Sequence, residues 1–189
     1  MNYGVYQNVR NASWQCLIDC GISSLPVPIS HICEIYGGKT VNNSDVHILQ
    51  GGQSGQIIVD GNEFSIIVND KESVQRIRFT IAHELGHYLL GHLGSDITNL
   101  NRGYDSIKPI QETEADMFAA RLLAPACVLW GINAQTAEQI AAVCNISREA
   151  AKIRAERMEV LRKRGKFLTS PLERKVYQQF ENYIQNNRL

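Results

Sequence analysis

The segment that most constrains the fold is residues 79–90, which combines apolar side chains with two histidines and a glutamate. If the segment is helical, apolar residues lie on both of its faces: Phe79, Ala82, Leu85, Leu89 and Leu90. A helix that is apolar nearly all round is a buried helix. Because buried polar groups without partners are costly, the sequence predicts a core helix whose histidines and glutamate are paired with other groups.

Residues 83–87 read His-Glu-Leu-Gly-His, which is the H-E-x-x-H pattern typical of zinc peptidases. Residues four apart on a helix stand one turn above each other, so the imidazoles of His83 and His87 can bind one metal ion. Glu84 lies beside them and is the predicted catalytic base, which takes a proton from a water molecule at the metal. The alternative interpretation is a hydrogen-bonded polar cluster that holds no metal.

A catalytic metal site of this kind needs a third protein ligand. The longer pattern H-E-x-x-H-x-x-G-x-x-H requires a glycine at 90 and a histidine at 93, where the sequence has Leu90 and Leu93. The sequence therefore excludes the class of zinc peptidases that has this longer pattern. His92 misses the required position by one residue, and we expect it to be a helix-end residue or a donor at the edge of the site.

A second predicted helix over 110–124 offers acidic candidates for the third ligand. At about 100° per residue, Glu112 and Asp116 share the apolar, inward face, whereas Glu114 lies about 200° from Glu112. We predict Glu112 as the third ligand, Asp116 as the hydrogen-bond partner of a ligand histidine, and Glu114 as a solvated charge. The alternative for Glu112 is a plain charge at a helix start, where the helix dipole favours it.

The donor set of two imidazoles and one carboxylate predicts one Zn²⁺ per chain, with manganese as the alternative. Three residues are candidate donors to the oxyanion that forms during peptide hydrolysis. These candidates are Arg102, Tyr104 and His92, of which the first two lie in a polar loop over 94–109.

The remaining pattern predicts a few strands among many helices. Two helical pieces are expected within 8–36, separated by a break at 21–28. Two short runs rich in Ile and Val, 56–60 and 64–68, predict a β-hairpin. Asn69 and Asp70 are the expected caps of the long helix that runs to about His92. Further helices are expected near 136–144, 147–163 and 171–186, so the fold class is α+β.

Two regions are expected: a metallopeptidase domain over 1–131 and a helical C-terminal region over 132–189. The stretch 136–160 resembles a helix-turn-helix, in which Asn145 takes the left-handed turn position and Ser147 caps the second helix. Basic residues of that helix could reach phosphates. They are Arg148, Lys152, Arg154 and Arg157. The alternative, a helical hairpin that packs on the catalytic domain or holds a protein partner, is favoured over DNA contact because the chain has no net charge.

Charge and cysteine content limit the partners and the compartment. The net charge is −6 over residues 1–147 and +6 over 148–189. The five cysteines include no C-x-x-C pair, and free buried thiols are expected. No apolar run is long enough for a membrane span, and the first fifteen residues lack the apolar stretch of a signal peptide, so a cytoplasmic protein is expected.

Two segments give a specific resemblance: FTIAHELGHYLLG at 79–91 and ETEADMFAARLLAP at 112–125. Together with LPVPI at 25–29 and the hairpin, they resemble the ImmA/IrrE family of metallo-endopeptidases over roughly residues 20–165. The one departure is Ala124 before the proline, where family members commonly have methionine. The resemblance implies a zincin-like fold, zinc held by His83, His87 and Glu112, and Glu84 as general base.

The resemblance also implies a biological task. Family members relieve repression by cutting a helix-turn-helix repressor, often in mobile elements or stress responses. We therefore expect an anti-repressor endopeptidase with such a repressor as its protein substrate. The alternative is a catalytically idle, metal-containing regulatory protein that acts by binding a repressor or DNA.

Overall fold

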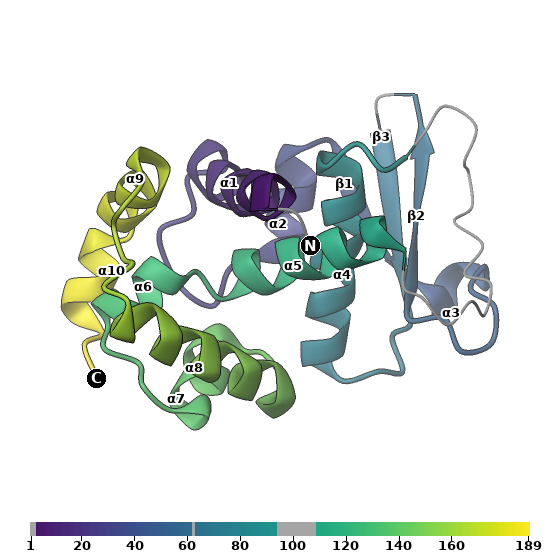
Figure 1. The fold of residues 1–189 in the computed structure, drawn as a ribbon. Coiled ribbons are helices and arrows are strands. Elements are labelled where there is room, and N and C mark those ends of the chain that lie inside the picture. Colours follow the sequence, from purple (N-terminus) through teal and green to yellow (C-terminus); the bar gives the residue numbers. More distant parts are fainter. Residues whose placement is uncertain (1–2, 62, 94–108) are drawn as a thin grey trace. The chain divides into compact units, whose positions relative to one another are not determined.

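The structure is a computed structural model that describes residues 3–61, 63–93 and 109–189 (Figure 1). It combines a small sheet with many helices, which confirms the predicted α+β class. The elements in chain order are α1 (Tyr3–Asp19), α2 (Ile29–Ile35), β1 (Gly38–Asn42), α3 (Asn43–Val46), β2 (Gly55–Asp60), β3 (Glu63–Val68), α4 (Val74–Leu89), α5 (Ile110–Leu123), α6 (Ala126–Gly131), α7 (Ala137–Cys144), α8 (Arg148–Lys163), α9 (Pro171–Gln179) and α10 (Glu181–Asn186).

The chain divides into two compact units that interleave along the sequence. The first comprises Met1–Val9 with Ile29–Ala119, and the second comprises Arg10–Pro28 with Ala120–Leu189. The helices α1 and α5 each contribute residues to both units. The boundary expected near residue 131 stays a prediction. Among the described residues, no helix combines the length and the apolar character needed to cross a membrane.

The sheet of the first unit has the strand order β1-β3-β2. The strands β2 and β3 pair antiparallel, with Ile57 opposite Ile66, which confirms the predicted hairpin. The strand β1, which the sequence analysis missed, pairs parallel with β3 and places Gly38 opposite Phe64. A Cβ atom at Gly38 would lie only 2.1 Å from the Phe64 ring, so the packing of the two strands requires glycine at this position. The strand β1 therefore lacks the alternation of apolar residues that would have predicted it.

The helix α4 packs against β2 and β3, and α2 packs against both β1 and α4. Ser73 caps α4, since its hydroxyl accepts a hydrogen bond from the Arg76 N–H at 3.3 Å. The predicted caps Asn69 and Asp70 were therefore wrong. The Asp70 side chain instead accepts from the backbone N–H of Ser44 at 2.9 Å. Residues 80–87 of α4 are all buried, as the apolar pattern predicts.

In the second unit, α7 and α8 form the predicted helix-turn-helix-like pair. Asn145 adopts the left-handed conformation, with φ of 50°, and ends α7. The Ser147 hydroxyl accepts from the Ala150 N–H at 3.1 Å and caps α8. The short helix α6 was missed, and the helix expected over 171–186 is divided at the buried Phe180 into α9 and α10.

All five cysteines are free thiols, as expected, and four of them are buried. Burial raises the pKa of the Cys127 thiol to about 12, because the thiolate would lose its hydration and lie near the Glu173 carboxylate.

We therefore expect Cys127 to resist alkylation in the folded chain at pH 8, whereas Cys20, which is partly exposed, reacts first. Peptide mass spectrometry after iodoacetamide treatment, with and without urea, measures this order. Modification of Cys127 before unfolding would contradict its burial.

Candidate metal centre

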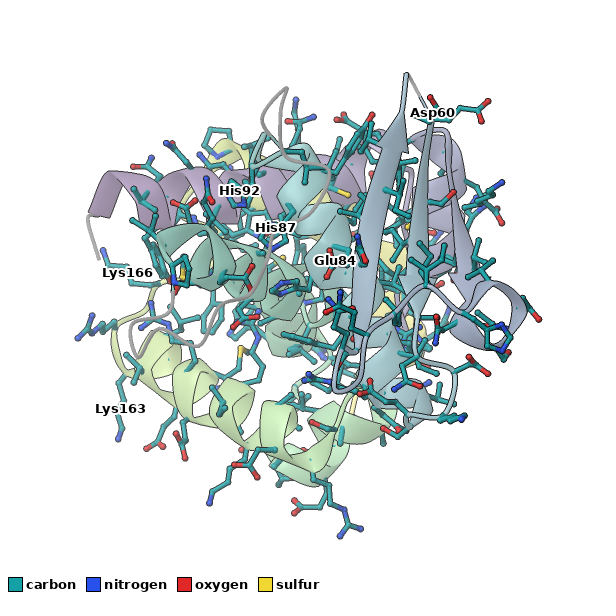
Figure 2. All side chains as sticks on the ribbon, turned by 90° about the vertical axis from the view of Figure 1, so that its right-hand side faces the viewer. Asp60, Glu84, His87, His92, Lys163 and Lys166 are labelled. Atoms are coloured by element: carbon teal, nitrogen blue, oxygen red, sulfur yellow. The ribbon has the colours of Figure 1, made fainter. Side chains whose placement is uncertain are left out.

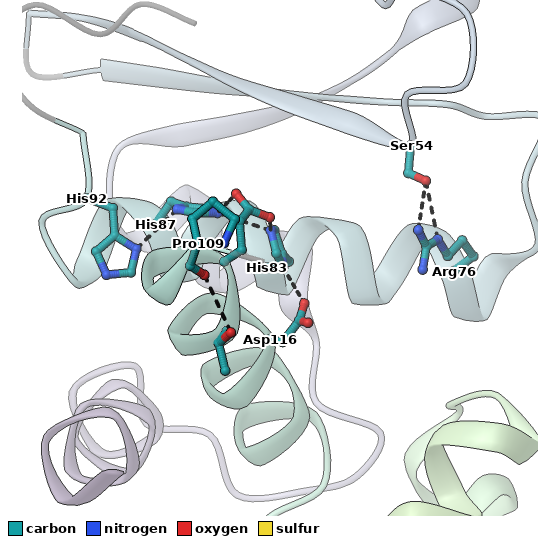
Figure 3. Close-up of polar contacts among 9 residues, drawn as sticks. Ser54, Arg76, His83, His87, His92, Pro109 and Asp116 are labelled. Atoms are coloured by element: carbon teal, nitrogen blue, oxygen red, sulfur yellow. Dashed lines mark hydrogen bonds and ion pairs between the residues drawn. The ribbon is translucent and has the colours of Figure 1, made fainter. Parts of the chain in front are cut away.

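The helix α4 presents His83 and His87 one turn apart, on a face that is closed to solvent. The two residues are 6% and 0% exposed. Their Nε2 atoms lie 3.1 Å apart, and their rings meet edge to face. Both Nε2 atoms are therefore directed to one point, as the i, i+4 spacing predicts (Figure 3).

Glu112 on α5 completes a three-residue cluster with these histidines. One carboxylate oxygen lies 3.4 Å from His83 Nε2, and the other lies 3.2 Å from His87 Nε2. The three potential ligand atoms all lie within 4.8 Å of one another, and all three residues are buried. Two ligands each about 2.0–2.2 Å from one zinc ion are separated by about 3–4 Å, so these donors fit a single metal ion.

Gly86 explains how α5 approaches α4 closely enough for Glu112 to reach the histidines. A Cβ atom at Gly86 would lie 3.1 Å from the Phe118 ring and 3.3 Å from the Cα atom of Ala115. The small residues at 86 and 115 therefore allow a close approach of the two helices, next to the cluster.

We expect Gly86→Val to lower the free energy of unfolding of the metal-free chain by about 1–3 kcal/mol, because its branched side chain overpacks this contact. Urea unfolding measures the change. The control Ala120→Val, at an exposed position of α5, is expected to lower stability by only about 0.5 kcal/mol, which is the lower helix propensity of valine. Equal stability of Gly86→Val and the parent chain would contradict the close approach of the helices.

Asp116, one turn after Glu112, hydrogen-bonds to His83 on the side of the ring away from the cluster. The His83 Nδ1–H donates to Asp116 Oδ1 at 2.8 Å, which leaves Nε2 available to the cluster. Burial lowers the pKa of His83, but the hydrogen bonds with Asp116 and Glu112 and the nearby Glu84 carboxylate raise it to about 9. The carboxylates therefore stabilise a positive charge at this histidine, and a bound metal cation would supply such a charge.

Glu84 follows His83 on α4 and is itself buried, with 4% of its surface exposed. Figure 2 labels Glu84 and His87, which both belong to this helix. Its carboxylate acts electrostatically on His83. The structure thus brings together His83, Glu84, His87, Glu112 and Asp116, which are the five residues that the sequence analysis placed at the centre of the site.

His92 follows the end of α4 and lies at the edge of the cluster, and the sequence analysis did not foresee its contact with Glu114. His92 Nδ1 lies 3.1 Å from His87 Nδ1, and His92 Nε2 lies 2.9 Å from Glu114 Oε2. The Glu114 side chain is only 18% exposed, so the expectation of a solvated charge was wrong. Burial and the neighbouring His87 lower the pKa of His92 in spite of its bond to Glu114.

Glu114 was misplaced because the sequence analysis took the direction of Glu112 as the inward face of α5. With Ala115 facing α4, Glu114 and Asp116 lie about 100° to either side of it, and a long glutamate side chain spans the remaining distance. The signal available in the sequence was the glycine directly before His92, since glycine after a helix end returns the chain over the last turn. The other two candidate oxyanion donors, Arg102 and Tyr104, lie outside the described residues.

Two of the basic residues on α8 bind the backbone of the second unit. Arg154 donates to the carbonyl of Ala124, and Arg162 donates to the carbonyl of Ala134. The exposed residues Arg148 and Lys152 have Glu149 and Glu156 as exposed neighbours on the same helix. The helix therefore presents mixed charge and not a basic stripe.

A helix-borne H-E-x-x-H pair completed by a glutamate from a later helix, beside a small sheet, defines a zincin-like core. Residues 53–156 match the peptidase family M78, described as the IrrE N-terminal-like domain. The match covers more than half of the chain, and the protein belongs to this family, the ImmA/IrrE family of metallopeptidases. No curated protein sequence matches the chain significantly.

Proposed function

We propose that the protein is a zinc-dependent endopeptidase. The observation that carries this proposal is the buried cluster of His83, His87 and Glu112, whose ligand atoms surround one point. Three protein ligands leave one coordination position of a tetrahedral ion open, which is the arrangement of catalytic zinc sites. Structural zinc sites, in contrast, fill all four positions with protein ligands.

Bound zinc would polarise the scissile carbonyl and increase the acidity of the attacking water. His83 and His87 would hold the zinc ion through Nε2, and the hydrogen bond with Asp116 keeps the His83 ring in the orientation that this requires. Glu84 accepts the proton of the attacking water and passes it to the leaving amine. The burial of Glu84 limits competing contact of its carboxylate with bulk solvent.

The oxyanion that forms on the carbonyl needs a further hydrogen-bond donor. We assign this role to Tyr104 or Arg102 in preference to His92. Both ring nitrogens of His92 already face other side chains, so it has no N–H directed toward a substrate.

The proposed substrate is a helix-turn-helix transcriptional repressor, which the enzyme cuts in the cytoplasm to relieve repression. Membership of the ImmA/IrrE family supports this assignment. The five free cysteines suit a reducing compartment. The α7–α8 pair, with Ile153 63% exposed on its surface, is the proposed element that recognises the repressor.

Co-incubation with the repressor encoded beside this gene tests the proposal. We expect two repressor fragments whose masses add to that of the parent plus one water, and no cleavage after treatment with a chelator and its removal by dialysis. Zinc added back to the dialysed chain should restore cleavage. An intact repressor under all conditions would contradict the substrate assignment.

The second candidate function is a metal-containing binding protein that acts on a repressor or DNA without hydrolysis. The helix-turn-helix-like pair favours it, but Arg154 and Arg162 are engaged with backbone carbonyls. A mobility shift over a salt series tests DNA binding, since phosphate contacts weaken as salt rises. Relief of repression by a chain that cannot cut would support this second function.

A further inference from the structure

The end of α4 folds back so that His92 lies beside His87. Gly91 takes a left-handed conformation, with φ of 72°, directly after the helix cap. The Gly91 N–H donates to the Tyr88 carbonyl at 3.2 Å, and the His92 N–H donates to the His87 carbonyl at 3.0 Å. These two bonds define a Schellman motif, which brings the second residue after the cap back against the last helical turn.

The His92 ring fills the space between His87 and Glu114. Its ring centroid lies 5.1 Å from that of His87, at an interplanar angle of 71° (Figure 3). Its Nδ1 faces His87 Nδ1 at 3.1 Å, and its Nε2 faces Glu114 Oε2 at 2.9 Å. His92 is 7% exposed and the Glu114 side chain 18% exposed, so water has little access to these bonds.

The positions of the nitrogens decide where the protons lie. Two N–H groups cannot face each other across 3.1 Å, so one of the two Nδ1 atoms must be an acceptor. His87 directs Nε2 to the cluster with His83 and Glu112, and a metal-binding nitrogen carries no proton. The proton of a neutral His87 is then on Nδ1.

This assignment fixes the other two hydrogen bonds. His92 must accept the His87 proton at its own Nδ1 and carry its single proton on Nε2. That Nε2–H donates to the Glu114 carboxylate, which is an acceptor only. The donors and acceptors therefore match at every step from Glu114 to His87.

We propose that Glu114 and His92 are positioning residues that hold His87 in the tautomer and orientation that binds the metal. Asp116 makes the same kind of contact directly with His83, so each ligand histidine has a carboxylate behind it. This inference rests on the metal centre of the proposed function. It adds that the Glu114–His92 pair sets metal affinity without touching metal or substrate.

The tautomers can be read directly by NMR of the zinc-loaded chain labelled with ¹⁵N at histidine. We expect His87 to carry its proton on Nδ1 and His92 to carry its proton on Nε2, each identified by long-range correlations to the ring carbon protons. A proton on His92 Nδ1, or zinc on His87 Nδ1, would overturn the inference. This measurement needs no variant and therefore does not depend on how a variant folds.

Variants measure the contribution of the pair to zinc affinity in competition with a chromogenic chelator. We expect Glu114→Ala to weaken zinc binding about 10-fold and His92→Leu about 10- to 100-fold. His92→Asn should recover much of the loss, since its amide oxygen can accept the His87 proton. Because the pair acts as a unit, Glu114→Ala should add little to His92→Leu.

The matched control is the exposed pair of His31 and Glu34, whose side chains lie 3.2 Å apart on α2 of the same unit. His31→Leu and Glu34→Ala are expected to leave zinc affinity within twofold. If the parent chain binds zinc but Glu114→Ala and His92→Leu bind it equally well, this inference fails and the proposed function stands. If the parent chain binds no zinc, both fail.

Discussion

Glu84→Gln is expected to lower peptidase activity about 10²- to 10⁴-fold while the chain keeps its fold and its metal. The amide has nearly the shape of the carboxylate, but it cannot accept the proton of the attacking water. Because Glu84 lies beside the ligand residues and is not one of them, zinc affinity should change little. The measurement is the initial rate of repressor cleavage, together with metal content per chain.

The matched control is Glu63→Gln, an exposed glutamate on β3 of the same unit, which is expected to cut at the parental rate. This pair of variants also separates the two candidate functions. If Glu84→Gln retains bound metal and still relieves repression without producing fragments, the protein acts by binding. If Glu84→Gln cuts at the parental rate, Glu84 is not the base.

The second large effect is expected from Glu112→Ala, which removes the only acidic member of the three-residue cluster. Loss of a residue that supports a metal ligand costs about 10- to 100-fold in affinity, so loss of the ligand itself should cost more than about 100-fold. Cleavage at limiting zinc should fall in parallel. Equilibrium dialysis against buffered zinc measures the affinity.

Thr113→Ala provides the control on the same turn of α5. The Thr113 hydroxyl bonds only weakly to the Pro109 carbonyl, at 3.5 Å, and should not influence the metal. Parental zinc affinity in Glu112→Ala would show that the carboxylate is a helix-start charge, which is the alternative considered from the sequence.

The two helices of the site were predicted well because their patterns are local. The apolar surroundings of His83 and His87 placed them on a buried helix, and the four-residue spacing of Glu112 and Asp116 placed both carboxylates near it. The cap residues were misassigned by three or four positions, since several residues before α4 are good caps by type and only their contacts decide among them.

Features that depend on pairing between distant segments could not be predicted in this way. The parallel strand β1 has a glycine, a lysine and an asparagine among its five residues, and its pairing with β3 becomes visible only in the folded chain. Likewise, the contact of Glu114 with His92 depends on how closely α5 crosses α4 at Gly86. The angular positions of residues around α5 do not reveal how far α5 lies from α4.

The central claim is that one divalent ion is bound by two imidazoles of α4 and one carboxylate of α5. Anomalous X-ray diffraction from crystals of the chain grown with zinc, collected on both sides of the zinc absorption edge, tests it most directly. We predict one strong anomalous peak per chain, about 2.0–2.2 Å from His83 Nε2, His87 Nε2 and a Glu112 oxygen. A zinc-treated crystal without a peak among these three side chains would contradict the account.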